Sequence, residues 1–465
     1  MIDQSTICAI STSPGTGAIA VIRLSGIAAI DIADRIFKSP TGRKKLADQN
    51  ANTLHYGELV YNKEIIDEVV VGVFKAPHSY TGEDLIEISC HGSIYVQQRI
   101  LEILVENGAR LARPGEFTLR AFLNGKMDLS QAEAVADLIA SSSAAAHRLA
   151  LNQMRGGFSQ EINELRDKLL HFTSLVELEL DFPEEDVEFA DRKELQVLAG
   201  KVEKLLRQLK NSFQLGNVIK NGIPVAIVGE TNVGKSTLLN ILLNEDKAIV
   251  SEIHGTTRDV IEDVVNIHGT AFRFFDTAGL RDTKDYIESL GIERAYNKLT
   301  GATIVLLVID CQNPYPVVKG RIDKIRERVS SKQNLVIVVN KIDIGSEDTI
   351  RKLESLDLKK NEKRVFMVAR DKKNLDELID IMTHTVNTDT SGREDVIVTN
   401  VRHYEILKKA HEAILRVVEG LKKGITGDLL AQDIRECIHY MGEITGEITT
   451  HEVLGHIFRN FCIGK

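Results

Sequence analysis

The chain has 465 residues, of which 43% are hydrophobic and 27% charged, and its formal net charge is −9. This length predicts about three domains, and the composition is typical of a soluble globular protein. The negative charge argues against a general electrostatic attraction to nucleic acid, so any RNA contact requires a local basic patch or a partner protein.

The cysteine and hydropathy patterns limit the class of protein further. The five cysteines lack Cys-x-x-Cys spacing, so neither a disulfide framework nor a zinc site is expected. The first residues show no basic segment followed by a long apolar run, and no apolar run anywhere reaches membrane-spanning length. We therefore expect an unprocessed, soluble protein of the reducing cytoplasm, without membrane or DNA contacts.

Residues 1–124 mix strand and helix patterns and predict a compact α+β domain. Strands are expected at residues 6–10, 18–24, 54–60 and 68–74, and helices at residues 27–37 and 94–107. Glu87 lies in another strand-like run, Leu-Ile-Glu-Ile-Ser, where a carboxylate is costly unless it is paired or faces a ligand. A structural ion pair or an exposed strand face is as compatible with Glu87 as a ligand contact, and the same holds for Arg23.

Residues 125–217 predict the first half of a helical domain. Apolar residues recur at helical spacing from Ser130 to Phe213, and Ser130 with Glu133 forms a possible capping box. The acidic, proline-containing stretch 181–188 interrupts this pattern. We interpret it as a solvated corner between helices, without chemistry of its own.

The most specific motif of the chain begins at Gly229. An apolar run at residues 223–228 is followed by Gly229-x-x-x-x-Gly234-Lys235-Ser236 and then by a helix-forming run, the strand, loop and helix order of a P-loop. The glycines let successive N–H groups converge on a phosphate beside the positive end of the helix. Lys235 is expected to contact the β- and γ-phosphates, and Ser236 to bind Mg²⁺. The alternative, a glycine turn between a core strand and a core helix, is disfavoured by the Lys-Ser pair.

Residues 218–382 alternate strands with helices, which predicts a mostly parallel sheet covered on both faces. Further strands are expected at residues 260–267, 271–275, 304–309, 335–339 and 364–368. Phosphate ligands of such sheets lie beyond the carboxyl ends of the strands, where the remaining motifs fall. Asp276 can hold Mg²⁺ through water, and Gly279 can offer its N–H to a γ-phosphate. Thr257, in a Gly-Thr-Thr-Arg-Asp loop, completes the Mg²⁺ shell only while the γ-phosphate is present.

The motif Asn340-Lys-Ile-Asp343 follows a strand and predicts guanine as the base. The Asp343 carboxylate accepts hydrogen bonds from N1–H and the exocyclic amine of guanine, and Asn340 braces the purine. Adenine presents the opposite donor pattern, and buried polar mismatches of this kind discriminate by roughly 10⁴–10⁵. The expected nucleotide is therefore GTP.

Two details shape the expected mechanism. Gly279 is followed by Leu280, where Ras carries the glutamine that orients water, so a residue within 280–293 must take this role. The residues alone do not choose among the four carboxylates of that stretch. Asn232 in the P-loop carries a hard neutral oxygen suited to a monovalent cation, although a loop-stabilising hydrogen bond is an alternative role.

Residues 383–465 predict three further helices, at residues 401–421, 428–441 and 450–461. The nucleotide domain is therefore interpreted as inserted between two helical halves. Gly424-Ile-Thr-Gly427 has the form of a KH loop, but both flanks are helical, and we expect an interhelical turn. Cys462, as an isolated observation, is more typical of an inert thiol than of a nucleophile.

The motifs taken together resemble one known family over essentially the whole chain. The polar stretches 79–92 and 113–126, the inserted nucleotide domain with Gly-Thr-Thr-Arg-Asp and Asp-Thr-Ala-Gly-Leu-Arg, and the terminal Cys-Ile-Gly-Lys closely resemble the MnmE (TrmE) family of tRNA-modification GTPases. The resemblance implies a multidomain protein of α/β plus α+β class. A Ras-like P-loop GTPase domain (218–382) would be inserted in an all-α helical domain (125–217 and 383–465). An α+β folate-binding-like domain (1–124) would precede it, dimerise and bind formyl-tetrahydrofolate.

The resemblance also implies site residues, carried over by motif. Folate contacts match Arg23, Glu87, Lys126 and Lys465, and Cys462 is a possible functional thiol. Glu288 matches the residue that positions the hydrolytic water, so Glu288 and Lys235 are the expected catalytic residues. Magnesium is assigned to Ser236 and Thr257, and the potassium ligands match Asn232, Ser251, Ile253 and Thr256. The expected GTP site further includes Val233, Thr237, Glu252, His254, Gly255, Thr277, Ala278, Lys341, Val368, Ala369 and Arg370.

This chain departs from the family pattern at two places. Thr231 stands where the family usually has proline, and Val368 stands where a serine normally precedes the alanine near guanine. The second departure removes a hydroxyl. The backbone N–H of Ala369 is still expected to meet the guanine carbonyl, so affinity rather than base choice is affected.

The function implied by the resemblance is a potassium-dependent, homodimeric GTPase. With its FAD-carrying partner MnmG (GidA), in a heterotetramer, it would install an aminomethyl or carboxymethylaminomethyl group at carbon 5 of the wobble uridine of certain tRNAs. This chain would supply folate and GTP. The alternatives are a ribosome-assembly GTPase of the Era-related class, which needs a KH module that the sequence does not show, and a folate enzyme merely regulated by GTP.

Overall fold

The computed structural model describes most of the chain and divides it into two compact units. The described residues are 5–42, 44–181, 192–243, 250–251, 262–275, 301–331, 333–387, 397–459 and 461–464. The first unit comprises Met1–Ala136, Asn152–Val202 and Lys409–Lys465, and the second comprises Asp137–Leu151 and Glu203–Lys408. This division into two units does not test the expected domain boundaries at residues 124, 217 and 382, which stay predictions.

The first unit contains a mixed sheet with the strand order β3-β4-β5-β6-β2-β1-β7. Its strands are β1 (Ile7–Ile10), β2 (Ile19–Ser25), β3 (Phe37–Lys38), β4 (Thr53–Tyr61), β5 (Glu64–Phe74), β6 (Leu85–His91) and β7 (Arg110–Leu111). The neighbouring strands are antiparallel except for the parallel pair β1 and β7. Three helices accompany the sheet: α1 (Ala29–Ile36), α2 (Ile94–Glu106) and α3 (Glu116–Leu123). The α+β prediction for this part of the chain is confirmed.

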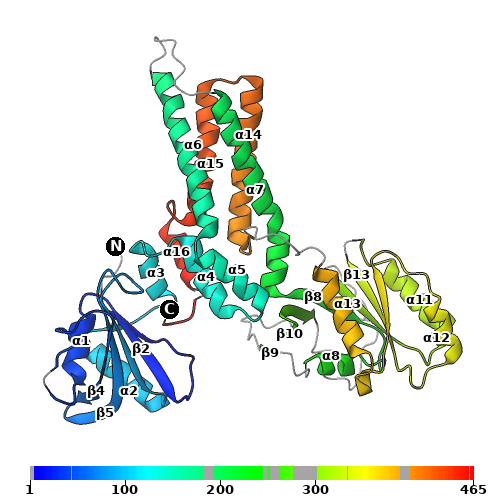
Figure 1. The fold of residues 1–465 in the computed structure, drawn as a ribbon, viewed down its shortest axis with the longest axis horizontal. Coiled ribbons are helices and arrows are strands. Elements are labelled where there is room, and N and C mark those ends of the chain that lie inside the picture. The colour runs from blue at the N-terminus through cyan, green and yellow to red at the C-terminus, as the bar shows by residue number, and fades with distance from the viewer. Residues whose placement is uncertain are drawn as a thin grey trace. The chain divides into compact units, whose positions relative to one another are not determined.

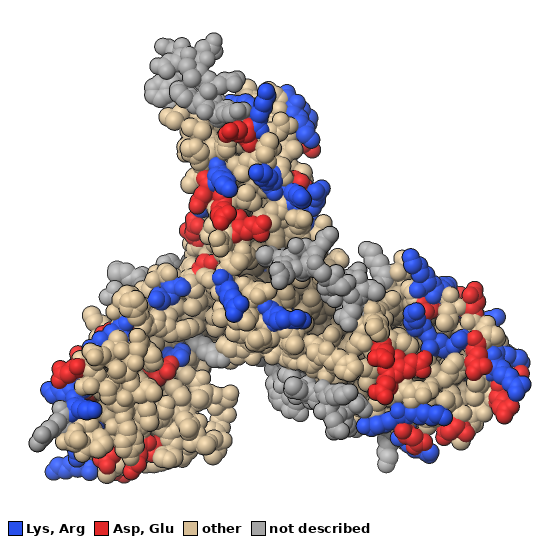
Figure 2. Space-filling view, viewed as in Figure 1, with Lys and Arg blue, Asp and Glu red and all other residues tan. Residues whose placement is uncertain are grey.

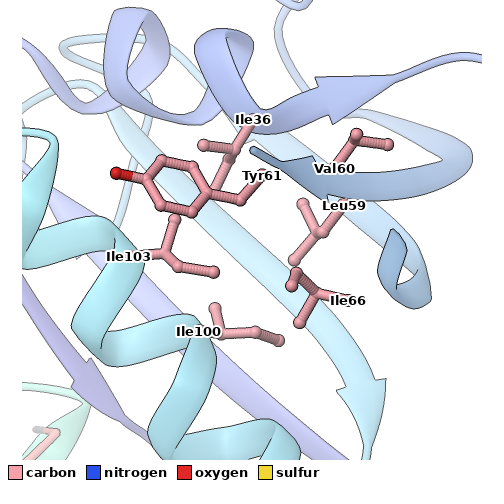
Figure 3. A pocket seen from close by; sticks show the side chains of 7 residues that line it. All are labelled: Ile36, Leu59, Val60, Tyr61, Ile66, Ile100 and Ile103. Carbon is pink, nitrogen blue, oxygen red and sulfur yellow. The ribbon is translucent and has the colours of Figure 1, made fainter. Parts of the chain in front are cut away.

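One face of this sheet packs against α1 and α2, because alternate strand residues such as Ile22, Val71 and Ile88 are buried together with Ile32 and Ile103. Figure 3 shows an apolar gap at this helix-covered face, which leaves no room for a water molecule and so belongs to the core. The gap is lined by Ile36, Leu59, Val60, Tyr61, Ile66, Ile100 and Ile103.

The opposite face of the same sheet carries exposed apolar side chains. Tyr56 pairs with Val70 across β4 and β5, Val70 pairs with Ser89, and Leu54 lies two residues before Tyr56, so these residues share one face. Leu54 is 72%, Tyr56 56% and Val70 38% exposed. An exposed apolar sheet face of this kind is typical of an interaction surface.

Further helices lie wholly or partly in the first unit, and their buried apolar residues form two separate clusters, Leu129 and Ala132 with Leu454 and Phe458, and Val176 with Ala431. The helices are α4 (Leu129–Ala140), α5 (Ala144–Met154), α6 (Gly157–Asp181), α7 (Arg192–Asn221), α14 (Val401–Lys423), α15 (Gly427–Thr445) and α16 (His451–Arg459), some of which continue into the second unit. Helices α6 and α15 lie side by side (Figure 1) and bury Val176 against Ala431. The turn before α15 begins at Gly424, which confirms the interhelical interpretation of Gly424–Gly427. Among the described residues, no helix is long and apolar enough to span a membrane.

The capping box predicted at Ser130 and Glu133 is wrong. Helix α4 begins at Leu129, and the reciprocal pair is Asp128 with Gln131: Asp128 Oδ1 accepts from Gln131 N–H, and Gln131 Oε1 accepts from Asp128 N–H, both at 2.9 Å. Ser130 lies within the helix, where its hydroxyl contacts Asp128 and Ser159. The capping chemistry is as expected, but it acts two residues earlier.

The second unit contains a sheet with the strand order β14-β13-β12-β8-β11-β10-β9. Its strands are β8 (Ile223–Val228), β9 (Val250–Ser251), β10 (Glu262–Ile267), β11 (Thr270–Phe275), β12 (Ile304–Asp310), β13 (Asn334–Asn340) and β14 (Glu362–Phe366). The pairs from β14 through β11 are parallel, and β9, β10 and β11 pair in antiparallel fashion.

Helices cover both faces of this sheet (Figure 1). Helices α8 (Lys235–Leu243) and α13 (Leu375–Asn387) contribute Leu238 and Leu378 to one core layer. Helices α11 (Tyr315–Arg326) and α12 (Glu347–Glu354) contribute Val318 and Leu353 to the other. The central strands β8, β12 and β13 are buried on both sides, which explains their nearly continuous apolar sequences and confirms the predicted α/β sheet.

Candidate functional site

The predicted P-loop connects β8 to α8 at the carboxyl end of the sheet. Gly229 and Gly234 adopt φ values of 152° and 104°, in the region that favours glycine. A Cβ atom at Gly229 would lie 2.3 Å from the carbonyl oxygen of Val308, and one at Gly234 would lie 2.3 Å from Nδ2 of Asn340. Both glycines are therefore required by close approach as well as by backbone conformation.

The ammonium group of Lys235 folds over this loop. Its Nζ atom donates a hydrogen bond of 2.8 Å to the carbonyl of Gly229 and a second one to the carbonyl of Glu230. Burial lowers the pKa of Lys235, and the nearby Glu230 carboxylate opposes this shift. Arg321 on α11 in turn pairs with Glu230 at 2.5 Å. A half-buried cation inside a loop of backbone groups is suited to bind an anion, because the anion would compensate its desolvation.

The guanine motif lies beside the P-loop, and Asn340 joins the two. Asn340 is buried, its Nδ2 donates to the carbonyl of Val233 at 2.8 Å, and its Oδ1 accepts from the N–H of Ala369 at 2.9 Å. In this structure the N–H of Ala369 donates to Asn340, and its expected contact with the guanine carbonyl stays a prediction. The Asn340 amide uses that N–H to hold the short helix Ala369–Asp371 in place.

Lys341 forms a second connection between the same loops. Its Nζ donates to the carbonyl of Asn232 at 2.8 Å and pairs with Asp310 Oδ2 at 2.7 Å. Lys341 and Asn232 both have a positive φ, 62° and 63°. Sequence reasoning missed Asp310, although a carboxylate at the end of the apolar run Ile304–Asp310 is a signal that could have found it.

The remaining predicted nucleotide residues lie around this junction. Val233 is buried beneath the loop, and Ser236 and Thr237 lie in the first turn of α8. Asp343 is one-third exposed, and its carboxylate lies 3.9 Å from the Arg370 guanidinium. The structure thus brings together the P-loop and guanine-motif residues from segments that are far apart in the chain.

Several predicted residues lie outside the described residues, so their positions stay predictions. They are Glu252, Ile253, His254, Gly255, Thr256, Thr257, Asp276, Thr277, Ala278, Gly279, Glu288 and Lys465. Ser251 ends β9, but its side chain is also outside the description. Within the described ranges, no group of three or more His, Cys, Asp and Glu residues is arranged to hold a metal ion.

In the first unit, Arg23 and Glu87 face each other across β2 and β6. Their shortest contact, Nη2 to Oε1, is 2.6 Å, and both side chains remain partly exposed. The Arg23 guanidinium also lies over the rings of Tyr80 and Phe117, at 5.2 and 5.7 Å. The ion-pair alternative for both residues is therefore observed, in a setting that adds two aromatic rings the sequence did not reveal.

The C-terminal tail lies against the same sheet. Gly464 is buried, its carbonyl accepts from Ser11 Oγ at 3.1 Å, and a Cβ on it would lie 2.1 Å from the carbonyl of Ile10. Ile10 directly follows the residue that pairs with Arg23. Lys126 is exposed and donates to the carbonyl of Pro77 at 3.0 Å, while Cys462 is an exposed free thiol.

The chain is similar to known proteins over its whole length. Residues 6–126 match the family model described as GTP-binding protein TrmE N-terminus, and residues 129–462 match the MnmE helical domain model. Proteins named tRNA modification GTPase MnmE are 57% identical in Bacteroides thetaiotaomicron and 53% identical in Flavobacterium johnsoniae, covering 100% of both chains in each case. Among solved structures, the G domain of the T. maritima FeoB iron transporter covers 36% of this chain and 97% of its own at 24% identity. Its TM-score of 0.24 is too low to support a conclusion about the fold.

Proposed function

Because the chain belongs to the MnmE family of tRNA modification GTPases, we propose that it hydrolyses GTP to GDP and phosphate in the modification of tRNA. The observation that carries this proposal is the junction at Asn340, which joins the P-loop to the guanine motif. A phosphate cradle and a guanine-reading carboxylate on neighbouring loops are what recognition of a guanine nucleotide requires.

The nucleotide is held by residues with distinct roles in this proposal. The loop from Gly229 to Gly234 surrounds the phosphates with backbone N–H groups, and Lys235 supplies a positive charge next to them. Asp343 accepts hydrogen bonds from guanine, and its partly exposed carboxylate is accessible for this. The contacts of Lys235 to two loop carbonyls are replaceable by phosphate oxygens, which suits a loop that binds and releases its ligand.

Hydrolysis requires a metal ion and a positioned water, for which we propose the residues implied by the family. Ser236 in the first turn of α8 and Thr257 would hold Mg²⁺, which neutralises charge on the phosphates when bound. Asn232, Ser251, Ile253 and Thr256 would hold K⁺. These residues offer hydroxyl, amide and carbonyl oxygens, which are ligands that hard cations prefer. Asn232 is an exposed residue of the P-loop. Glu288 would orient the attacking water, and Lys235 would stabilise the departing phosphate charge.

We further propose that the first unit binds formyl-tetrahydrofolate and forms a homodimer. Arg23 offers a cation, Glu87 an acceptor, and Tyr80 and Phe117 offer rings against which a flat pterin can stack. Lys126 and the tail with Lys465 would complete the site, with Cys462 as a possible functional thiol. The exposed apolar face at Leu54, Tyr56 and Val70 supports self-association, because burying it in a second copy removes apolar area from water.

The proposed assembly includes the FAD-carrying partner MnmG and tRNA, in the cytoplasm. On the face drawn in Figure 2, Lys and Arg are interspersed with Asp and Glu among the described residues. The net charge of −9 argues against a general electrostatic attraction to tRNA, which supports binding of tRNA together with the partner. The Era-like alternative loses support, because Gly424 and Gly427 lie at a turn between α14 and α15.

The experiment that tests this function is GTP hydrolysis by the purified full-length chain in KCl and in NaCl. We expect turnover with GTP and not with ATP, stimulated by K⁺ and abolished by Lys235→Ala. A K⁺-independent rate would remove the potassium proposal alone. The absence of any GTP turnover in the presence of Mg²⁺ and K⁺ would contradict the proposed activity.

A further inference from the structure

We propose that Asp310 is a positioning residue for guanine-nucleotide binding, which acts by holding Lys341 against the carbonyl of Asn232. This inference rests on the proposed function, because it assumes that the nucleotide binds across the P-loop and the guanine motif. It assigns a role to a carboxylate that belongs to neither motif and lies at the end of β12.

The contacts place Asp310 between the two loops. Strand β12 pairs with β8, which leads into the P-loop, and with β13, which leads into the guanine motif. Asp310 itself is opposite Asn340 in the sheet. Its Oδ2 atom lies 2.7 Å from Lys341 Nζ, and the same Nζ donates to the Asn232 carbonyl at 2.8 Å. The ammonium group of Lys341 therefore connects the guanine motif to the P-loop and to the end of β12.

Burial strengthens the attraction between Asp310 and Lys341. Asp310 is 8% exposed as a residue, and the Lys341 side chain is 29% exposed, so solvent screens their attraction less than at an open surface. The Lys341 ammonium gains a charged acceptor that fixes its position. Asn232 and Lys341 both hold a positive φ, a conformation that is costly for residues other than glycine and needs support from its surroundings. The hydrogen bond from Lys341 to Asn232 provides such support.

A purely structural role for Asp310 is the competing explanation. Its Oδ1 atom accepts a hydrogen bond of 2.9 Å from the N–H of Gln312, which stabilises the turn after β12. The substitution Asp310→Asn removes the negative charge, and its single amide oxygen can accept from Gln312 or from Lys341 but not from both, because the other position becomes an NH₂ donor. A Lys341→Met background separates the two roles, since the positioning role requires the Lys341 ammonium.

The proposal predicts a specific change in nucleotide binding. Without the carboxylate, Lys341 no longer holds Asn232, so the nucleotide must order both loops when it binds. Dissociation of GDP should accelerate about tenfold, as expected for the loss of a hydrogen bond between charged groups. The kcat at saturating GTP should change little, because the ordered loops are the same once the nucleotide is bound.

The test is stopped-flow dissociation of fluorescent methylanthraniloyl-GDP from the full-length chain and its variants. Asp310→Asn should release the nucleotide about tenfold faster than wild type, with KM for GTP raised and kcat retained. The matched control is Asp348→Asn on α12. Asp348 forms an exposed ion pair with Lys352, with Oδ2 2.6 Å from Nζ, and its substitution should leave the rate of GDP dissociation unchanged. On a Lys341→Met background, Asp310→Asn should add less than about twofold, since its partner is gone.

Each outcome decides a separate claim. An Asp310→Asn variant that keeps the wild-type melting temperature and the wild-type dissociation rate overturns the positioning role. Full additivity with Lys341→Met overturns it as well, because Asp310 would then act through another group. If the wild-type chain itself fails to bind the fluorescent GDP, the proposed function fails instead.

Discussion

The side-chain amide of Asn340 donates a hydrogen bond of 2.8 Å to the carbonyl oxygen of Val233, 107 residues earlier in the chain. The other end of the same amide accepts from Ala369. Through these two hydrogen bonds the buried side chain of Asn340 connects its own loop to the P-loop and to the loop at Ala369, at the carboxyl end of the sheet. The geometry of the nucleotide site therefore depends on this side chain even before a ligand binds.

Replacing Asn340 by aspartate should weaken GDP binding by about 10- to 100-fold, because the buried carbonyl of Val233 loses its hydrogen-bond donor. The carboxylate keeps the shape of the amide but presents an oxygen to the Val233 carbonyl, which cannot donate to it. Equilibrium titration with fluorescent GDP measures the change. An affinity within about twofold of wild type would mean that the Val233 contact does not position the site.

Gly234→Ala should reduce GDP affinity at least about tenfold, because the new Cβ would lie 2.3 Å from Nδ2 of Asn340 at a positive φ. Gly320→Ala on α11 is the matched control, since nothing lies within 4 Å of its Cβ position. That control should keep GDP affinity and raise stability by about 0.5–1 kcal/mol, as expected for alanine within a helix. Equal losses of affinity in both variants would contradict the steric argument.

Much of the nucleotide site could be predicted because its information is local. The strand before Gly229, the glycine spacing and the helix after Lys235 lie within one short stretch, and the structure has them in that order. The guanine motif likewise follows directly on β13. Fold class was predictable for the same reason, since buried parallel strands leave continuous apolar runs between helical patterns.

The parts that were missed depend on neighbours far away in the chain. Asp310 gains its role only because β12 lies between β8 and β13, which no local pattern states. The hydrogen bond from the N–H of Ala369 to Asn340 likewise depends on two segments that are far apart in the chain. Strand β14 was predicted at residues 364–368 and is observed at Glu362–Phe366. It is an edge strand with polar residues, so its hydrophobic pattern is weak.

Glu288→Ala should leave GTP binding nearly intact while slowing turnover by about 10²-fold or more, if Glu288 orients the attacking water as proposed. Glu293→Ala is the control, because it removes a carboxylate from the same stretch without touching the proposed role. Single-turnover hydrolysis in KCl, together with GTP affinity, separates binding from chemistry. An unchanged rate for Glu288→Ala, or a larger effect for Glu293→Ala, would remove Glu288 from its role.

Val70→Glu should dissociate the proposed homodimer, because it places an unpaired carboxylate on the apolar sheet face beside Tyr56. Val105→Glu is the matched control on α2, on the helix-covered side of the same sheet, where the native valine is exposed to a similar extent, 42% against 38%. Sedimentation velocity should show a monomer for the first variant and a dimer for the second. A dimeric Val70→Glu variant would mean that another surface mediates self-association.

The central claim is that guanine-nucleotide turnover at this site serves tRNA modification, and nucleoside analysis of tRNA tests it most directly. Wobble uridines should be analysed by mass spectrometry in a strain that lacks this chain and in the same strain expressing either the wild-type chain or Lys235→Ala. We predict loss of the carbon-5 modification in the deletion strain, recovery with the wild type and no recovery with Lys235→Ala. Unchanged wobble nucleosides in the deletion strain would contradict the account.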